Sequence, residues 1–157
     1  MLDINQVCDY IIFRLKSEDE AQLSHLKLQK LLYYVQSWNL AFYSKPLFSG
    51  KFQAWIHGPV NRVIYDRFKD SKFIYSPINL SDIINPNITE LISHENKSHI
   101  DVVLEVYAPF TDTDLEIKTH EEEPWLEARN GYVASERCEV ELNENTMHRY
   151  YNARLHK

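Results

Sequence analysis

The chain has 157 residues, of which 44% are hydrophobic and 25% are charged, and its formal net charge at pH 7 is -6. A chain of this length fits one domain that buries a hydrophobic core without disulfide or metal cross-links. The acidic balance argues against an obligate DNA- or RNA-binding protein, which needs a basic face to neutralise phosphates. It fits either a basic protein partner or solubility alone.

Targeting and redox signals indicate a cytoplasmic protein. The N-terminus, MLDINQVCDY, lacks the basic region and apolar run of a signal peptide. No apolar stretch approaches the ~20 residues that cross a bilayer. Cys8 and Cys138 stand outside any CxxC pair, so we expect free thiols in a reducing compartment. Neither a membrane nor a cofactor is expected.

The first predicted helix spans residues 3–16. Asp3 can cap it and Gln6 follows three residues later, which is the spacing of a capping box. A second helix, HLKLQKLLYYVQSWNLAFY, spans residues 25–43 and is capped by Ser24. Its apolar residues cover nearly every face, which is typical of a helix buried among others. We therefore place it at the centre of the fold.

The polar residues of that helix leave two interpretations open. Lys27, Lys30 and Ser37 line up as a narrow strip that we expect to face water. Gln29 and Gln36 share one flank of the same helix. They form either a satisfied amide network in the core, because buried polar groups need partners, or a site at its edge.

Residues 52–68 combine a short strand, a turn and a helix. The alternation in FQAWI predicts a strand over 52–56, and Gly58 breaks the chain direction. Pro59 suits the first position of a helix. That helix would bury an apolar face and expose Arg62, Asp66 and Arg67.

The rest of the chain predicts several shorter elements. Residues 70–97 are irregular, with short helices after Ser81 and over 89–93. Further elements are a helix over 99–107 capped by Ser98, one from Thr113 through Ile117, one over 124–131, a short strand over 138–142 and a last helix after Asn143. Together these predict a single, mainly α domain over residues 1–157, compact around the 25–43 helix, with one or two short β-strands.

Motifs of catalysis are missing from the sequence. It contains no G-x-S-x-G, P-loop, G-x-G-x-x-G or H-E-x-x-H pattern. His120 precedes three glutamates and, with His57 brought near by the fold, makes a His/carboxylate metal site one hypothesis. The alternative is local: Thr119 and Glu122 have capping-box spacing, and acidic residues favour a helix start.

Aromatic and basic residues gather around the Gly-Pro turn. Trp and Arg are common anchors of protein interfaces. The candidate partner-binding residues are Trp55, His57, Arg62, Tyr65, Arg67, Glu122, Trp125 and Arg129. The competing interpretation is that the tryptophans belong to the core and the arginines are merely solvated.

Three segments in order resemble a known family. They are LSHLKLQKLLYYVQSWNLAFYSKPLF (23–48), FQAWIHGPVNRVIYDRF (52–68) and THEEEPWLEARNG (119–131). Their L-K-L-Q-K-L-x-Y-Y-x-Q, Trp-x-x-Gly-Pro-Val and Thr-His…Pro-Trp patterns resemble the Panacea domain, the SocA-like, phage-associated family of bacterial antitoxins. The resemblance covers roughly residues 5–151.

This resemblance implies a binding protein without catalytic residues. Such antitoxins neutralise a toxin encoded beside them, usually by direct contact, and one member is associated with delivering its toxin to a Clp-type protease. Some members carry an added DNA-binding segment, for which this chain has no room, so we expect no DNA binding. Two other classes stay open: an enzyme with an unrecognised His/carboxylate metal site, and a phage regulator that binds a host protein.

Overall fold

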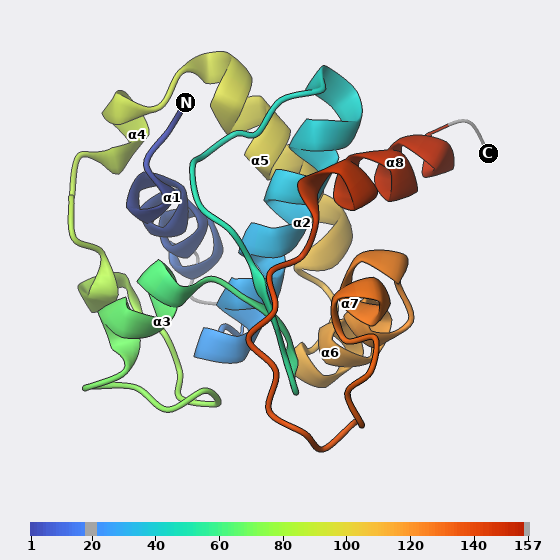
Figure 1. Ribbon diagram of the computed structural model, residues 1–157. Helices are drawn as coiled ribbons and strands as arrows, with labels where there is room; N and C mark the ends of the chain where they lie inside the picture. The colour runs from blue at the N-terminus through green and yellow to red at the C-terminus, as the bar shows by residue number, and fades with distance from the viewer. Residues whose placement is uncertain (18–21, 156–157) are drawn as a thin grey trace.

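The computed structural model describes residues 1–17 and 22–155, and its architecture is mainly α-helical (Figure 1). The one small sheet in that part of the chain pairs β1 (Gln53–Trp55) with β2 (Gly58–Val60). The helices are α1 (Ile4–Lys16), α2 (His25–Tyr43), α3 (Arg62–Phe68), α4 (Ile88–Leu91), α5 (His94–Tyr107), α6 (Asp112–His120), α7 (Glu123–Ala128) and α8 (Glu144–Arg154), with a 3-10 turn at Leu80–Asp82. The predicted fold class is confirmed.

Helix α2 lies at the centre of the molecule, with α5 and α8 packed along it (Figure 1). Every residue from His25 to Ser37 is buried. The prediction of a central buried helix is therefore confirmed, but the expected wet strip is wrong. Lys27, Lys30 and Ser37 are all inside, because α6 and β2 cover that side of the helix.

An internal ion pair fastens α1 to α3. The Arg67 guanidinium donates to the Asp9 carboxylate, and the two side chains are only 8% and 3% exposed. Asp9 also accepts from the backbone N–H groups of Ile84 and Asn85, at 3.1 and 3.0 Å. The expectation that Arg67 lies on the exposed face of α3 is wrong, because α1 brings a carboxylate to that face.

The β-hairpin is arranged differently from its predicted form. Pro59 pairs with Ala54 inside the hairpin and does not open α3. Asn61 caps that helix instead, since its side chain accepts from the Ile64 N–H at 3.1 Å. On the other side of β1, the predicted strand over 138–142 is an extended segment joined by an isolated bridge from Gln53 to Glu141.

Two predicted caps also lie elsewhere. Helix α5 begins at His94 behind Ser93, so Ser98 is an ordinary residue of its second turn. Thr119 lies inside α6, where its hydroxyl donates to the Glu116 carbonyl at 2.9 Å, so it forms no capping box with Glu122. The caps at Asp3, Ser24 and Asn143 are confirmed, and Asp3 forms the expected capping box.

No helix in residues 1–17 and 22–155 combines the length and apolarity needed to span a membrane.

We predict that two arginines of α3 differ sharply in their effect on stability. Arg67→Ala should lower the free energy of unfolding by about 3–5 kcal/mol, because it leaves the buried Asp9 carboxylate without its partner. Arg62→Ala, in the same helix but with an exposed side chain, should change it by no more than about 0.5 kcal/mol. Urea unfolding of both variants measures the difference. Equal losses would show that the Arg67 ion pair does not hold α1 in place.

Candidate partner-binding surface

The turn between β1 and β2, together with the start of α3, presents a group of aromatic and basic side chains. We call the exposed parts of Trp55, Ile56, His57, Arg62 and Tyr65 the turn surface. The rings of Trp55 and Tyr65 meet edge to face at 4.8 Å. The Arg62 guanidinium lies 5.5 Å from the Trp55 ring and 5.7 Å from the Tyr65 ring. One arginine therefore covers two aromatic rings at the surface.

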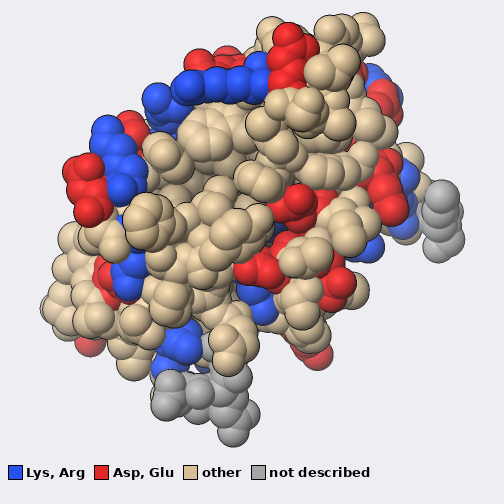
Figure 2. All heavy atoms as spheres, turned by 90° about the horizontal axis from the view of Figure 1, so that it is seen from below, with Lys and Arg blue, Asp and Glu red and all other residues tan. Residues whose placement is uncertain are grey.

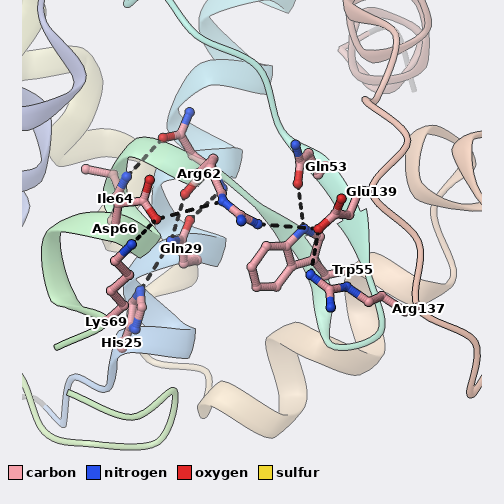
Figure 3. A network of polar contacts seen from close by, with 11 residues as sticks. His25, Gln29, Gln53, Trp55, Arg62, Ile64, Asp66, Lys69, Arg137 and Glu139 are labelled. Atoms are coloured by element: carbon pink, nitrogen blue, oxygen red, sulfur yellow. Dashed lines mark hydrogen bonds and ion pairs between the residues drawn. The ribbon is translucent and has the colours of Figure 1, made fainter.

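Exposed ion pairs orient that arginine (Figure 3). Arg62 lies 3.8 Å from the Asp66 carboxylate and 3.5 Å from that of Glu139. Arg137 binds Glu139 at 2.9 Å, and its hydrogen bond and charge lower the pKa of the Glu139 carboxyl. Solvent-exposed pairs contribute little stability. They nevertheless hold Arg62 over the rings and leave the local charge nearly balanced.

The turn approaches α2 so closely that only glycine fits at position 58. Gly58 has φ +108°, a conformation that side chains rarely adopt. A Cβ there would lie 2.6 Å from Cε of Lys30 and 2.8 Å from Oγ1 of Thr119. Lys30 in turn donates from Nζ to the Pro59 carbonyl at 2.9 Å. The position of the turn is thus set by a buried lysine of the central helix.

Burial changes the protonation of that lysine. The Lys30 side chain has no exposure, and burial lowers its pKa to about 7, an effect that the nearby Glu116 charge opposes. Glu116 also pairs with Nδ1 of His57 at 3.1 Å. The Glu116 carboxylate therefore lies between a buried cationic group and the histidine of the turn surface.

Two of the predicted partner-binding residues lie beneath the turn. Trp125 is buried and donates from its indole N–H to the Trp55 carbonyl at 2.9 Å. Arg129 is also buried and donates to the carbonyls of Ala54, Val133 and Glu136, at 2.8, 2.7 and 2.6 Å. Both side chains hold the backbone of the turn in place from below.

Glu122 lies in the core, away from the acidic surface on which it was predicted. Its carboxylate accepts hydrogen bonds from the hydroxyls of Tyr34 at 2.7 Å and Tyr151 at 3.0 Å. Burial raises the pKa of the Glu122 carboxyl, and these two hydrogen bonds oppose the rise. Its neighbours Glu121 and Glu123 are exposed. Glu122 joins α7 to α2 and α8.

The eight candidate residues therefore divide into two groups. Trp55, His57, Arg62 and Tyr65 come together on the turn surface, whereas Arg67, Glu122, Trp125 and Arg129 point inward. Sequence reasoning missed Tyr75, whose ring lies 6.1 Å from that of His57. The sequence pointed to Tyr75 only as an aromatic residue within the irregular, turn-rich segment 70–97.

The hypothesis of a metal site gains no support from the arrangement of the histidines. His57 binds Glu116, and the His120 ring stacks on Trp125 with centroids 4.0 Å apart. Within residues 1–17 and 22–155, no three His, Cys, Asp or Glu side chains are grouped so that they could hold a metal ion.

Comparisons with known proteins identify the family of this chain. Residues 28–126 match the sequence profile of the family described as "Antitoxin SocA-like, Panacea domain". The chain belongs to this family. It is also similar to Antitoxin SocA of Caulobacter vibrioides (strain NA1000 / CB15N), with 38% identity over 65 residues. That alignment covers 40% of this chain and 35% of the relative, so the similarity reaches about a third of that protein's length. No solved structure matches the chain.

The part of the chain that matches the Panacea profile contains almost the whole candidate site. It begins inside α2 and ends inside α7, so it includes the hairpin, α3 and every residue of the turn surface. Among the eight candidate residues only Arg129 falls beyond it.

We predict that alanine substitutions at two glycines destabilise the protein by different amounts, because one adds only backbone strain and the other also adds a steric clash. Both Gly58 and Gly131 have positive φ, but a Cβ at Gly131 meets nothing within 4 Å. Gly131→Ala should therefore cost only the strain of a left-handed residue, about 1–2 kcal/mol. Gly58→Ala should lower the free energy of unfolding by a further ~1–3 kcal/mol, because the new Cβ would push the side chains of Lys30 and Thr119 away from the turn. Urea unfolding measures both, and similar losses would mean that the turn can move away from α2.

We also predict a pH dependence of stability that comes from Lys30. Its pKa falls from 10.5 to about 7 on folding, so between about pH 7 and 9 the unfolded chain binds more protons. The free energy of unfolding should therefore rise with pH there, by at most about 1.4 kcal/mol per pH unit. The cost of burying the charge is complete below about pH 7 and disappears toward pH 10.5.

Lys30→Met should remove this rise. Lys69→Met, at an exposed lysine paired with Asp66, serves as the control and should keep it. Unfolding is measured in urea at several pH values between about 7 and 9. An unchanged slope in Lys30→Met would show that Lys30 titrates alike in the folded and unfolded chains.

Proposed function

We propose that this protein is an antitoxin that neutralises a cognate protein toxin by direct binding, with the turn surface as part of the contact. Membership of the SocA-like Panacea family is the observation that carries the proposal, and the relative in Caulobacter vibrioides is itself named an antitoxin. The partner is then the toxin, which we expect to be encoded by a neighbouring gene and to meet the antitoxin in the cytoplasm.

The composition of the turn surface supports its role in binding. Trp, Tyr and Arg dominate the small set of residues that carry most of the energy of protein interfaces. Here Trp55, Tyr65 and Arg62 lie in mutual contact and are partly or largely exposed. A partner can therefore cover two aromatic rings and a directional donor group at once.

The support beneath the turn adds to this argument. Lys30, Trp125 and Arg129 each donate to a carbonyl of the hairpin, at 2.9, 2.9 and 2.8 Å. A surface that is already held in its bound shape loses less conformational entropy on association. The four inward-pointing candidate residues fit this positioning role.

Several titratable side chains that could act in catalysis are instead bound to partners within the protein, which supports a non-catalytic role. His57 and Glu116 bind each other, Glu122 accepts from two buried tyrosines, and Asp9 pairs with Arg67. Each of these groups is engaged in holding the fold. Neutralisation by contact needs no turnover, so one antitoxin is consumed for each toxin that it binds.

Co-expression with the neighbouring toxin gene tests the proposal. We expect growth to be restored, the toxin to remain at an unchanged level, and the two proteins to co-purify. Growth restored while the toxin disappears would instead indicate delivery to a protease. Toxicity that persists with both proteins present would contradict an antitoxin role for this pair.

Within that assay, we predict that Arg62→Ala weakens toxin binding by about 30-fold, the loss typical of an interface hot spot. Its melting temperature should stay the same, because the side chain is exposed. The control is Arg14→Ala, since the Arg14 side chain is 49% exposed against 47% for Arg62 and makes one surface ion pair with Asp101 of α5. Calorimetric titration measures the affinities. Tight binding by a stably folded Arg62→Ala protein would place the contact elsewhere.

A further inference from the structure

The segment 72–78, which we call the aromatic loop, exposes two aromatic rings, and one of them, Tyr75, lies beside the turn surface. The Phe73 side chain is 86% exposed and that of Tyr75 is 58% exposed. Single exposed apolar residues are normal in folded proteins. Two such aromatic residues, two positions apart in one short loop, make a patch of the kind that marks an interaction site.

The loop is fixed to the start of α2. The first N–H groups of a helix have no partner within the helix. Here the His25 N–H donates to the Ser76 carbonyl at 3.1 Å, and the Leu26 N–H donates to the Ile74 carbonyl at 2.7 Å. The Ile78 N–H returns a third bond to the Leu23 carbonyl at 2.8 Å. The loop backbone thus completes the hydrogen bonding of the central helix.

Further bonds close the loop on itself. The Phe73 N–H donates to the Ser76 hydroxyl at 2.9 Å, and the Ser76 N–H donates to the Phe73 carbonyl at 3.0 Å. Lys72 donates from Nζ to the Pro77 carbonyl at 2.8 Å. The two exposed rings are therefore carried by a backbone that is held by hydrogen bonds before a partner binds. Less conformational entropy is then lost when these residues enter an interface.

The position of the loop joins it to the turn surface. The Tyr75 ring lies 6.1 Å from the ring of His57, which belongs to that surface. From the side of the molecule on which the hairpin turn lies in Figure 1, a broad uncharged area is visible with a group of acidic atoms beside it (Figure 2). The Tyr75 and His57 contact therefore places the loop beside the turn surface.

Acidic residues of α6 border this face. Asp112 and Tyr75 line the same open groove, and the Glu116 carboxylate binds His57, whose ring lies 6.1 Å from that of Tyr75. Partial burial and the charges of Glu116 and Asp112 raise the pKa of the Tyr75 hydroxyl, which agrees with this arrangement. Asp112 and Asp114 also stand in the first turn of α6. A partner that covers Tyr75 brings its own residues beside these carboxylates, and complementary charge there requires lysine or arginine.

We propose that the aromatic loop and the turn surface form a single interface, which the toxin meets with an apolar pocket bordered by Lys or Arg residues. This inference rests on the proposed antitoxin function and specifies it. Phe73 and Tyr75 enter the pocket, and Asp112 and Glu116 face its basic border.

The molecule provides a matched control at the opposite end of α2. Phe42 and Tyr43 are also adjacent exposed aromatic residues, at 50% and 56%, and they border an open groove of about 860 Å³ together with Met1 and Val102. Helix α2 has 19 residues and is therefore about 28 Å long, at ~1.5 Å per residue. The two aromatic pairs lie near its opposite ends. One interface of the proposed kind cannot depend equally on both pairs.

The test measures binding of the toxin identified by co-expression to three purified variants. Phe73→Ser/Tyr75→Ser should weaken binding at least about 30-fold with an unchanged melting temperature. Phe42→Ser/Tyr43→Ser should change it less than about 3-fold. Tyr75→Arg removes no buried contact within the protein, because Tyr75 is exposed. It should also abolish tight binding, because it places a positive charge against the basic border of the toxin's pocket.

Ionic strength tests the charge of the partner. The association rate of the wild-type protein should fall as NaCl rises, and Asp112→Asn should reduce that dependence. A salt-independent rate would overturn the basic border. Loop variants that bind like wild type, or losses as large in the control pair, would overturn the interface. Failure of the wild-type protein to bind any toxin would instead overturn the antitoxin function, so the two failures are distinguishable.

Discussion

The burial of α2 on every side is the constraint on which the rest of the structure depends. A helix that carries lysine, glutamine and asparagine inside a core must supply each with a hydrogen-bonding partner, because an unpaired buried polar group is costly. These five side chains find backbone groups in three surrounding segments, at Ala108, over residues 59–61 and over residues 45–48. The bonds run from Lys27 to the Ala108 carbonyl, from Gln29 to Asn61, from Lys30 to Pro59, from Gln36 to Leu47 and Phe48, and from Asn39 to Lys45. The polar residues of the helix thus determine where the neighbouring loops lie.

The same constraint positions both halves of the proposed interface. Lys30 holds the hairpin turn through the Pro59 carbonyl, and the missing side chain at Gly58 lets the turn approach α2 closely. The free N–H groups at the start of α2 hold the aromatic loop. Because one rigid helix sets both, the distance between the turn and the loop is fixed before any partner arrives. This arrangement holds the backbone that carries the exposed aromatic residues in place without a partner.

The sequence predicted what depends on local pattern and missed what depends on distant partners. The burial of α2 and the caps at Asp3, Ser24 and Asn143 depend on residues that are close in the sequence, and all were predicted correctly. Arg67 looked solvated because its partner Asp9 lies 58 residues earlier in the chain. Glu122 looked like part of a surface run because its tyrosine partners come from α2 and α8. Long charged side chains are buried only where partners compensate for the lost water, so residues distant in the sequence decide which of them lie inside.

The same division runs through the proposed interface, where buried residues hold the backbone and exposed side chains project from it. Gln29, Lys30, Gly58 and Trp125 lie within the segment that matches the family profile, and all of them are buried and engaged in positioning backbone. By contrast, Ile56, Phe73 and Tyr75 project from the backbone that these residues position, and their side chains are largely exposed. Substitution at such positions changes what the surface can bind with little effect on stability. In the proposed interface, the side chains of the turn and the aromatic loop therefore select the toxin, while the buried residues beneath them hold the backbone in place.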